Sequence, residues 1–221
     1  MFDVERHRRE YHHDLHTVIP EVLPADLCSR LVDRLKGLIT DQRIPMVDRE
    51  RKKRTVDLEF DGRYLHYLAD GPRVRRSFPE LESVYHLLRI FLVTLTSRDV
   101  IVSPHKVSDI TINGYPPGGG TLGAHYDTNG ITVLIYLTTN TEGPLRLEIE
   151  HDDPWRGTSM ELSRSAVKKE ILPVAGSMVV MQGRRVRHDS APMREEFKAV
   201  AIFNYYWTGD TRRPEGLDDV A

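Results

Sequence analysis

Three residues in the second half of the sequence, His125, Asp127 and His188, have side chains that could bind one metal ion. Residues i and i+2 of an extended strand project to the same face, so His125 and Asp127 would reach the ion together. His188 is a plausible third ligand. Two neutral imidazoles and one carboxylate, which leave coordination positions open, are the ligand set of non-haem iron(II) oxygenases. The sequence therefore indicates an iron enzyme.

The surroundings of these residues strengthen that prediction, because a His-x-Asp pair alone occurs by chance in many proteins. A glycine-rich turn at 118–120 precedes the pair, and an apolar run that contains Tyr136 follows it. Taken alone, His188 is better explained as a hydrogen-bonded histidine at the end of a strand. The joint pattern favours metal ligation by all three residues.

A lysine, Lys198, stands at the head of a run without any charged residue, 199–207. Val200 and Ile202 alternate with it and would share its face of a strand. A lysine directed inward with them needs an anion, since an unpaired buried ammonium is costly. A dicarboxylate cosubstrate would provide that anion. The alternative is that Lys198 lies at the strand edge with its amine in water.

At this point the sequence resembles the 2-oxoglutarate- and Fe(II)-dependent oxygenases, in particular the branch similar to prolyl 4-hydroxylases. The resemblance covers about 110–207, while the first half of the chain matches only through its pattern of a strand and helices. The matching features, in order, are Tyr115-Pro116, His125-x-Asp127, Ile135-Tyr136-Leu137, Gly176, His188 and Lys198.

The resemblance implies a role for each of these residues. His125, Asp127 and His188 would bind Fe(II), Lys198 would pair with the distal carboxylate of 2-oxoglutarate, and Tyr136 and Tyr115 would hydrogen-bond that cosubstrate. Such an enzyme consumes O2, releases succinate and CO2, and is stimulated by ascorbate. Halogenating relatives have a small residue in place of the carboxylate, so Asp127 favours hydroxylation of an unactivated C–H bond. Desaturation, ring closure and epoxidation use the same ligand set and stay open as alternatives.

The sequence also offers candidate contacts for the substrate. Thr111 and Asn113 alternate with Tyr115, and Arg146 follows a Gly-Pro turn, so these three are candidate substrate contacts. We expect a small molecule, such as an amino acid or a natural-product intermediate, because no peptide-binding repeat accompanies the catalytic segment. The alternative is a peptidyl or protein hydroxylase of the prolyl 4-hydroxylase type.

Two further hypotheses belong to other functional classes. A metal-dependent hydrolase or isomerase could use the same three ligands around another metal, although Lys198 would then have no dicarboxylate to bind. A non-catalytic ligand-binding barrel would also agree with the pattern of strands. Release of succinate from 2-oxoglutarate distinguishes the oxygenase from both.

The elements that must position these residues fall into two groups. Apolar residues at helical spacing predict helices that begin near Ala25 and that span Pro79–Thr96, and a short strand precedes them at Leu15–Ile19. Short runs rich in branched and aromatic residues then predict strands at Ile110–Tyr115, Thr121–Asp127, Ile131–Thr138, Leu145–Glu150, Glu170–Leu172, Ser177–Met181, Val186–His188 and Lys198–Trp207. We expect an α+β fold with a double-stranded β-helix (jelly-roll) core and N-terminal helices packed on one sheet.

Composition sets the limits of these interpretations. The 221 residues suit one domain, 1–221, with a helical support at 1–105 and a jelly-roll core at 106–210. A net charge of -2 gives no reason to expect nucleic acid or membrane as a partner. Cys28 is the only cysteine, and the chain has no apolar run long enough to cross a membrane. We expect a soluble, cytoplasmic protein of unknown oligomeric state.

Three polar segments are given no metal site or regular structure. The histidines at the start, His7, His12, His13 and His16, are expected in a solvated tail, and His151-Asp152-Asp153 in a surface turn. The charged stretch from Asp41 to Lys53 is expected to be a loop, which could close over a ligand.

Overall fold

The computed structural model describes residues 3–50, 63–120, 123–149 and 167–209, which form four helices and eleven strands. The helices are α1 (Val4–His13), α2 (Ala25–Thr40), α3 (Gly71–Ser77) and α4 (Pro79–Thr96). The strands are β1 (His16–Ile19), β2 (Met46–Glu50), β3 (Arg63–Ala69), β4 (Val100–Val102), β5 (Ile110–Tyr115), β6 (Ile131–Tyr136), β7 (Leu145–Ile149), β8 (Val167–Ile171), β9 (Met178–Met181), β10 (Val186–Ser190) and β11 (Lys198–Trp207). These strands pair antiparallel in two sheets, in agreement with the expected combination of helices and antiparallel strands.

The larger sheet has eight strands in the order β1-β9-β6-β11-β5-β3-β2, and β4 pairs with the end of β11. The long strand β11 lies between β5 and β6. Lys198 pairs with Tyr115 of β5, and Val200 pairs with both Asn113 of β5 and Tyr136 of β6. Since residues opposite one another on adjacent strands share a face, this register gathers polar side chains from three strands on one side of the sheet.

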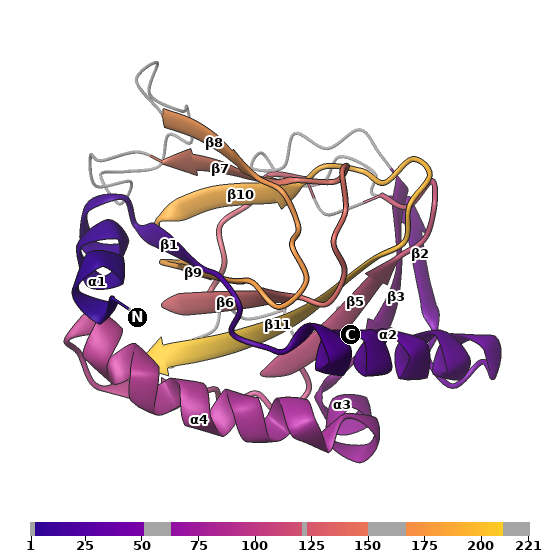
Figure 1. Ribbon diagram of the computed structural model, residues 1–221, viewed down its shortest axis with the longest axis horizontal. Helices are drawn as coiled ribbons and strands as arrows, with labels where there is room; N and C mark the ends of the chain where they lie inside the picture. The colour runs from indigo at the N-terminus through magenta and orange to yellow at the C-terminus, as the bar shows by residue number, and fades with distance from the viewer. Residues whose placement is uncertain (1–2, 51–62, 121–122, 150–166, 210–221) are drawn as a thin grey trace.

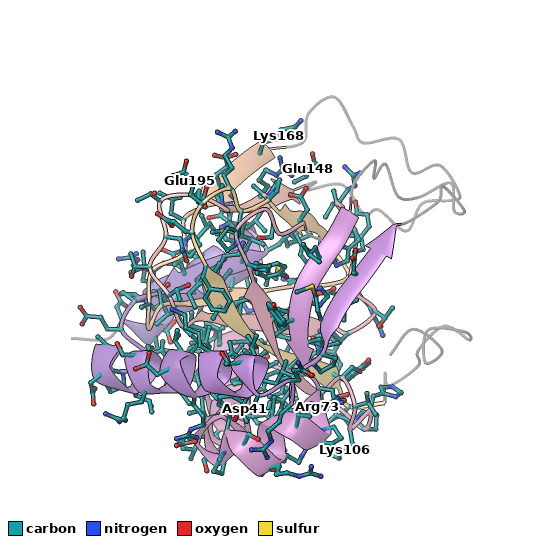
Figure 2. The ribbon with its side chains drawn as sticks, turned by 90° about the vertical axis from the view of Figure 1, so that its right-hand side faces the viewer. Asp41, Arg73, Lys106, Glu148, Lys168 and Glu195 are labelled. Atoms are coloured by element: carbon teal, nitrogen blue, oxygen red, sulfur yellow. The ribbon has the colours of Figure 1, made fainter. Side chains whose placement is uncertain are left out.

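The smaller sheet consists of β10, β7 and β8. Alternation along β7 buries Leu145 and Leu147 on its inner face and leaves Arg146 exposed on the other. On the outer face Glu148 accepts a hydrogen bond from Arg187 and lies 3.7 Å from the Lys168 ammonium. Figure 2 labels Glu148 and Lys168 on this sheet. The charged outer face and the apolar inner face fix which side of this sheet packs against the larger one.

Two clusters of buried side chains hold the layers together. In Figure 1, α2 and α4 lie on one side of the larger sheet and the smaller sheet lies on the other. Leu35 of α2 and Leu92 of α4 belong to the cluster beneath the larger sheet. Leu147 and Val186 belong to the second cluster, with residues of the larger sheet. Burying each such side chain contributes about 1.5–3 kcal/mol to folding, so the sheets that carry the site are firmly fixed.

The two predicted long helices are confirmed. The α2 helix begins at Ala25, directly after Pro24, and α4 spans the predicted residues from Pro79, at its first turn, to Thr96. The α4 helix ends where Ser97 adopts a left-handed conformation with φ of 55°. Among the helices of the described ranges, none combines the length and the apolar character that crossing a lipid bilayer requires.

The expectation of a solvated histidine tail at the start of the chain is wrong for His7 and His16, whereas His12 and His13 are exposed as expected. Residues 4–13 form α1, in which His7 is 5% exposed and Tyr11 is 1% exposed. The His7 Nδ1 atom lies 2.9 Å from the Thr17 hydroxyl, and that hydroxyl donates to Glu10. His16 is also buried. The two buried residues of α1 lie four positions apart, as on one face of a helix. The helix is otherwise polar, so this spacing gives a weak signal in the sequence.

The expectation of a loop at 41–53 holds for residues 41–45 but is wrong for residues 46–50. Met46–Glu50 forms β2, which pairs along its whole length with β3, and both strands extend the larger sheet at one edge. Such a strand has little apolar content of its own, so its partner determines its conformation. Residues 51–53 and the predicted turn at 151–153 lie outside the described residues.

Candidate metal centre

His125, Asp127 and His188 meet in space because the backbone joins their two chain segments. His125 and His188 form a single bridge in which each backbone N–H donates to the other residue's carbonyl, with both N···O distances 2.9 Å. The Asp127 N–H donates to the carbonyl of Gly183, also at 2.9 Å. Residues 123–127 form no strand beyond this bridge, so the predicted strand at 121–127 was wrong in its described part.

The three side chains converge closely enough for one ion to contact all of them. Their ligand atoms lie within 4.8 Å of one another. The Asp127 carboxylate lies between the two histidines, with Oδ1 3.4 Å from His125 Nε2 and Oδ2 3.6 Å from His188 Nε2. The imidazole rings stand 4.5 Å apart between centroids. This arrangement presents two nitrogens and one carboxylate on one side of a potential ion.

Hydrogen bonds outside the cluster set the direction of each ligand. His125 Nδ1 donates to the carbonyl of Gly123 at 2.8 Å, and His188 Nδ1 donates to the carbonyl of Val186 at 3.0 Å. A carbonyl only accepts, so the proton of each neutral ring lies on Nδ1 and the Nε2 lone pair faces the cluster. The Thr132 hydroxyl donates to Asp127 Oδ2. The donor set therefore fits a divalent transition metal.

The electrostatics of the cluster agree with that fit. Burial opposes ionisation of Asp127, but His188, His125 and the Thr132 hydroxyl outweigh it, so the pKa of the carboxyl lies below its usual value. Burial, followed by repulsion from His125, lowers the pKa of His188 even though Asp127 acts in the opposite direction. An ionised carboxylate and a neutral imidazole are the forms that bind metals.

Lys198 lies at the other end of the same group of side chains. It is 1% exposed, so the alternative with its amine in water was wrong. Its Nζ donates to the carbonyl of Gly143 at 2.8 Å and to the Ser190 hydroxyl, and stands 4.8 Å above the Tyr115 ring. No ion pair of Lys198 occurs among the described residues, and burial lowers the pKa of its ammonium to about 8.

One cavity of about 370 Å³, which we call the central cavity, joins the metal cluster to Lys198. It lies between the two sheets. Its described lining comprises Leu68, Ser108, Thr111, Asn113, Tyr115, His125, Tyr126, Asp127, Thr128, Asn129, Thr132, Leu134, Tyr136, Leu145, His188, Asp189, Ser190, Lys198, Val200, Ile202, Asn204 and Tyr206. The predicted residues Tyr115, Tyr136, Thr111 and Asn113 all belong to this lining.

Two residues differ from the sequence prediction. Arg146 is absent from the described lining: its side chain is 46% exposed and its Nε donates to Asp189 Oδ1 at 2.7 Å. It forms a surface ion pair rather than the predicted substrate contact. Ser190 was missed, although it follows His188 by two positions on β10, and alternation along a strand would have placed it on the same face.

Comparison with solved structures identifies the fold. A prolyl-4-hydroxylase of Pseudomonas putida is 14% identical, matches 92% of this chain and 98% of its own, and superposes with a TM-score of 0.62. AviO1 of Streptomyces viridochromogenes Tue57 is 15% identical over 97% of this chain and 99% of its own, with a TM-score of 0.71.

A third similar structure contains bound ligands. The epimerase SnoN from nogalamycin biosynthesis, in complex with Fe3+, alpha ketoglutarate and nogalamycin RO, is 14% identical, with a TM-score of 0.73 over 98% of this chain and 88% of its own. This chain has the fold of the 2-oxoglutarate- and iron(II)-dependent oxygenases. The oxygenase fold is thus shown by structure alone, since no protein family model and no curated protein matches the sequence.

Proposed function

We propose that this chain is a 2-oxoglutarate- and Fe(II)-dependent dioxygenase built as one catalytic domain, with a double-stranded β-helix core behind its N-terminal helices. One observation carries the proposal. The central cavity brings together two histidines and an aspartate at one end and, at the other, a buried lysine that forms no ion pair with a carboxylate of the described residues. A bound metal and a dicarboxylate together would satisfy both ends, and neither alone would do so.

The proposal assigns a role to the metal cluster and to Lys198. His125, Asp127 and His188 hold the iron through the atoms that already face one another. Lys198 binds the distal carboxylate of 2-oxoglutarate. When bound, the iron and its cosubstrate supply the oxidising chemistry, in which O2 is consumed and succinate and CO2 are released. Ascorbate stimulates the enzyme by keeping the metal ferrous.

The two cavity tyrosines act as neutral hydrogen-bond donors. Burial raises the pKa of Tyr115 above its usual value, and burial, followed by the neighbouring Tyr115, raises the pKa of Tyr136. Both phenols therefore keep their protons at neutral pH and can donate to the cosubstrate's carboxylate groups. Both side chains line the central cavity and are buried, with Tyr136 3% exposed and Tyr115 6% exposed.

The reaction that the proposal favours is hydroxylation of an unactivated C–H bond in a small molecule. Similar structures include SnoN from nogalamycin biosynthesis as well as a prolyl-4-hydroxylase, so the fold alone does not select the substrate class. A hydrolase or isomerase with the same ligands would leave Lys198 without a role. The buried ammonium, which has no carboxylate partner in the described part of the chain, therefore favours the oxygenase.

The test is direct binding and turnover of 2-oxoglutarate. Purified protein is loaded with Fe(II) without oxygen, and cosubstrate binding is followed by the visible charge-transfer absorption that chelation to ferrous iron produces. Under air and ascorbate, succinate release is then measured. The same protein loaded with Zn(II) is the matched control, which binds the cosubstrate without turnover. A protein that binds iron but neither chelates nor consumes 2-oxoglutarate would contradict the proposal.

A further inference from the structure

Asn113 lines the central cavity with a polar atom that has no hydrogen-bond partner among the described residues. The residue lies on β5, is 7% exposed, and donates through Nδ2 to the Tyr115 hydroxyl at 3.2 Å. Its Oδ1 atom is buried and accepts no hydrogen bond from any described residue. A buried acceptor without a donor is unfavourable, and such atoms in native proteins call for an explanation.

The strands on either side of Asn113 cannot provide that donor. Its cross-strand partners are Val200 on β11 and Leu68 on β3, and both are apolar and line the cavity beside it. The next cavity residue outward along β5 is Thr111, and the next inward is Tyr115. The Tyr115 oxygen already accepts from the Asn113 amide, which leaves the tyrosine proton free to donate elsewhere.

The proposed cosubstrate cannot satisfy Asn113 either. The 2-oxoglutarate dianion has two carboxylates and one ketone, all of which are acceptors, and no N–H or O–H group. Its oxygens suit Lys198 and the protons of Tyr115 and Tyr136. The Asn113 oxygen is therefore an acceptor that neither the described residues nor the cosubstrate matches, and a donor group on the second substrate would match it.

The charges of the cavity limit what that substrate can be. Among the described lining residues, the charged side chains are Asp127, Lys198 and Asp189. The first two are engaged by the metal and the cosubstrate in the proposed function, and Asp189 is paired with Arg146. A charged substrate group would enter this part of the cavity without a counter-ion, and burying it would be costly.

We infer that Asn113 is a specificity-determining residue, which selects an uncharged substrate that presents an N–H or O–H group to its side-chain oxygen. The inference rests on the proposed function, because it takes the lysine end to be filled by 2-oxoglutarate. It narrows the substrate class to neutral alcohols and amides and disfavours free amino acids, whose ammonium and carboxylate groups have no partners here.

The experiment uses matched probes that differ in one donor. The full chain is loaded with Mn(II), with and without 2-oxoglutarate, because the paramagnetic ion broadens the NMR signals of molecules that enter the cavity. The probe pairs are cyclohexanol with cyclohexyl methyl ether, and N-methylbenzamide with N,N-dimethylbenzamide. L-Proline serves as the zwitterionic probe.

For the wild type we expect the donor of each pair to bind roughly tenfold more tightly than its methylated partner, and L-proline to bind more weakly than both donors. Asn113→Leu, which keeps the shape of the side chain, should abolish the difference within each pair. Asn113→Asp, which keeps an acceptor oxygen, should retain it. Thermal unfolding of both variants checks that they fold.

Three results would overturn the inference: equal binding within each pair, an unchanged preference in Asn113→Leu, or no probe reaching the cavity. Failure of the proposed function gives a different pattern. In that case 2-oxoglutarate would not bind the manganese-loaded chain, while the preference for donor probes would be measured independently of it.

Discussion

The two ends of the central cavity are prepared for opposite charges. At the metal end, Asp127 is ionised, and both histidines are held by backbone carbonyls with their lone pairs facing inward. At the lysine end, a cation is buried among neutral partners, the carbonyl of Gly143 and the hydroxyl of Ser190. Among the described residues, no cation is paired with Asp127 other than through the two histidines, and no carboxylate forms an ion pair with Lys198. In the proposed function, a metal cation would complete the first end and a dicarboxylate the second.

The largest expected effect is at the metal end. Asp127→Ala removes the carboxylate ligand and should weaken Fe(II) binding by more than roughly 100-fold, the upper range for loss of an outer-shell partner. Succinate formation should be lost with it. Metal content after dialysis measures the effect. Asp189→Asn, which removes a nearby carboxylate that is not a ligand, should keep its iron. Equal iron loss in both variants would show that Asp127 acts only through general charge.

The second prediction separates the two ends. Lys198→Ala should weaken 2-oxoglutarate binding by roughly 100-fold, since it leaves a buried carboxylate without its cation. Iron binding should stay within about twofold of the wild type, because no metal ligand contacts the ammonium. Titration of the metal-free variant with Fe(II) measures the first constant, and titration of the iron-loaded variant with 2-oxoglutarate measures the second. Joint loss of iron and cosubstrate binding would mean that the two ends are not independent.

The third prediction concerns pH at the lysine end. Burial lowers the pKa of Lys198 to about 8, so the free protein loses this cation as the pH rises through that value. The dianion binds the protonated form, so its affinity should be constant below about pH 8 and fall roughly tenfold per pH unit above it. Calorimetric titration across this range tests the expectation. Lys198→Arg, which stays charged, should show no such decline.

The smallest expected effect lies just outside the cavity. Arg146→Ala breaks the ion pair with Asp189 on the outer face of the smaller sheet. Because Arg146 is largely exposed and lines neither end of the cavity, cosubstrate affinity should change by less than about twofold. The same 2-oxoglutarate titration measures it. A tenfold change would place Arg146 in the binding machinery after all.

The parts of the fold that the sequence predicts well are those with a strong local period. The apolar stripe of α4 and the uncharged run of β11 identify both elements to the residue. The strand β2 is charged and acquires its conformation by pairing with β3, a contact across many residues of chain. The helix α1 is polar, and two buried residues among ten are a weak local signal.

In the site, too, some features can be predicted from local sequence and others depend on contacts between distant segments. The residue types of His125, Asp127, His188 and Lys198 already indicate their chemistry, but only the fold shows that they share a cavity. Arg146 lies between Leu145 and Leu147, whose burial turns it outward, so strict alternation along β7 would have corrected that prediction. The unpartnered oxygen of Asn113 has no counterpart in the sequence, because it depends on what neighbouring strands fail to donate.

The reciprocal backbone bond between His125 and His188 has a consequence for assembly. The two residues lie far apart along the chain, and this main-chain link holds them side by side. An ion therefore finds its full ligand set only after β10 has docked. We therefore expect metal binding to be completed late in folding. A variant in which β10 packs less stably should lose bound ferrous iron before its helices unfold.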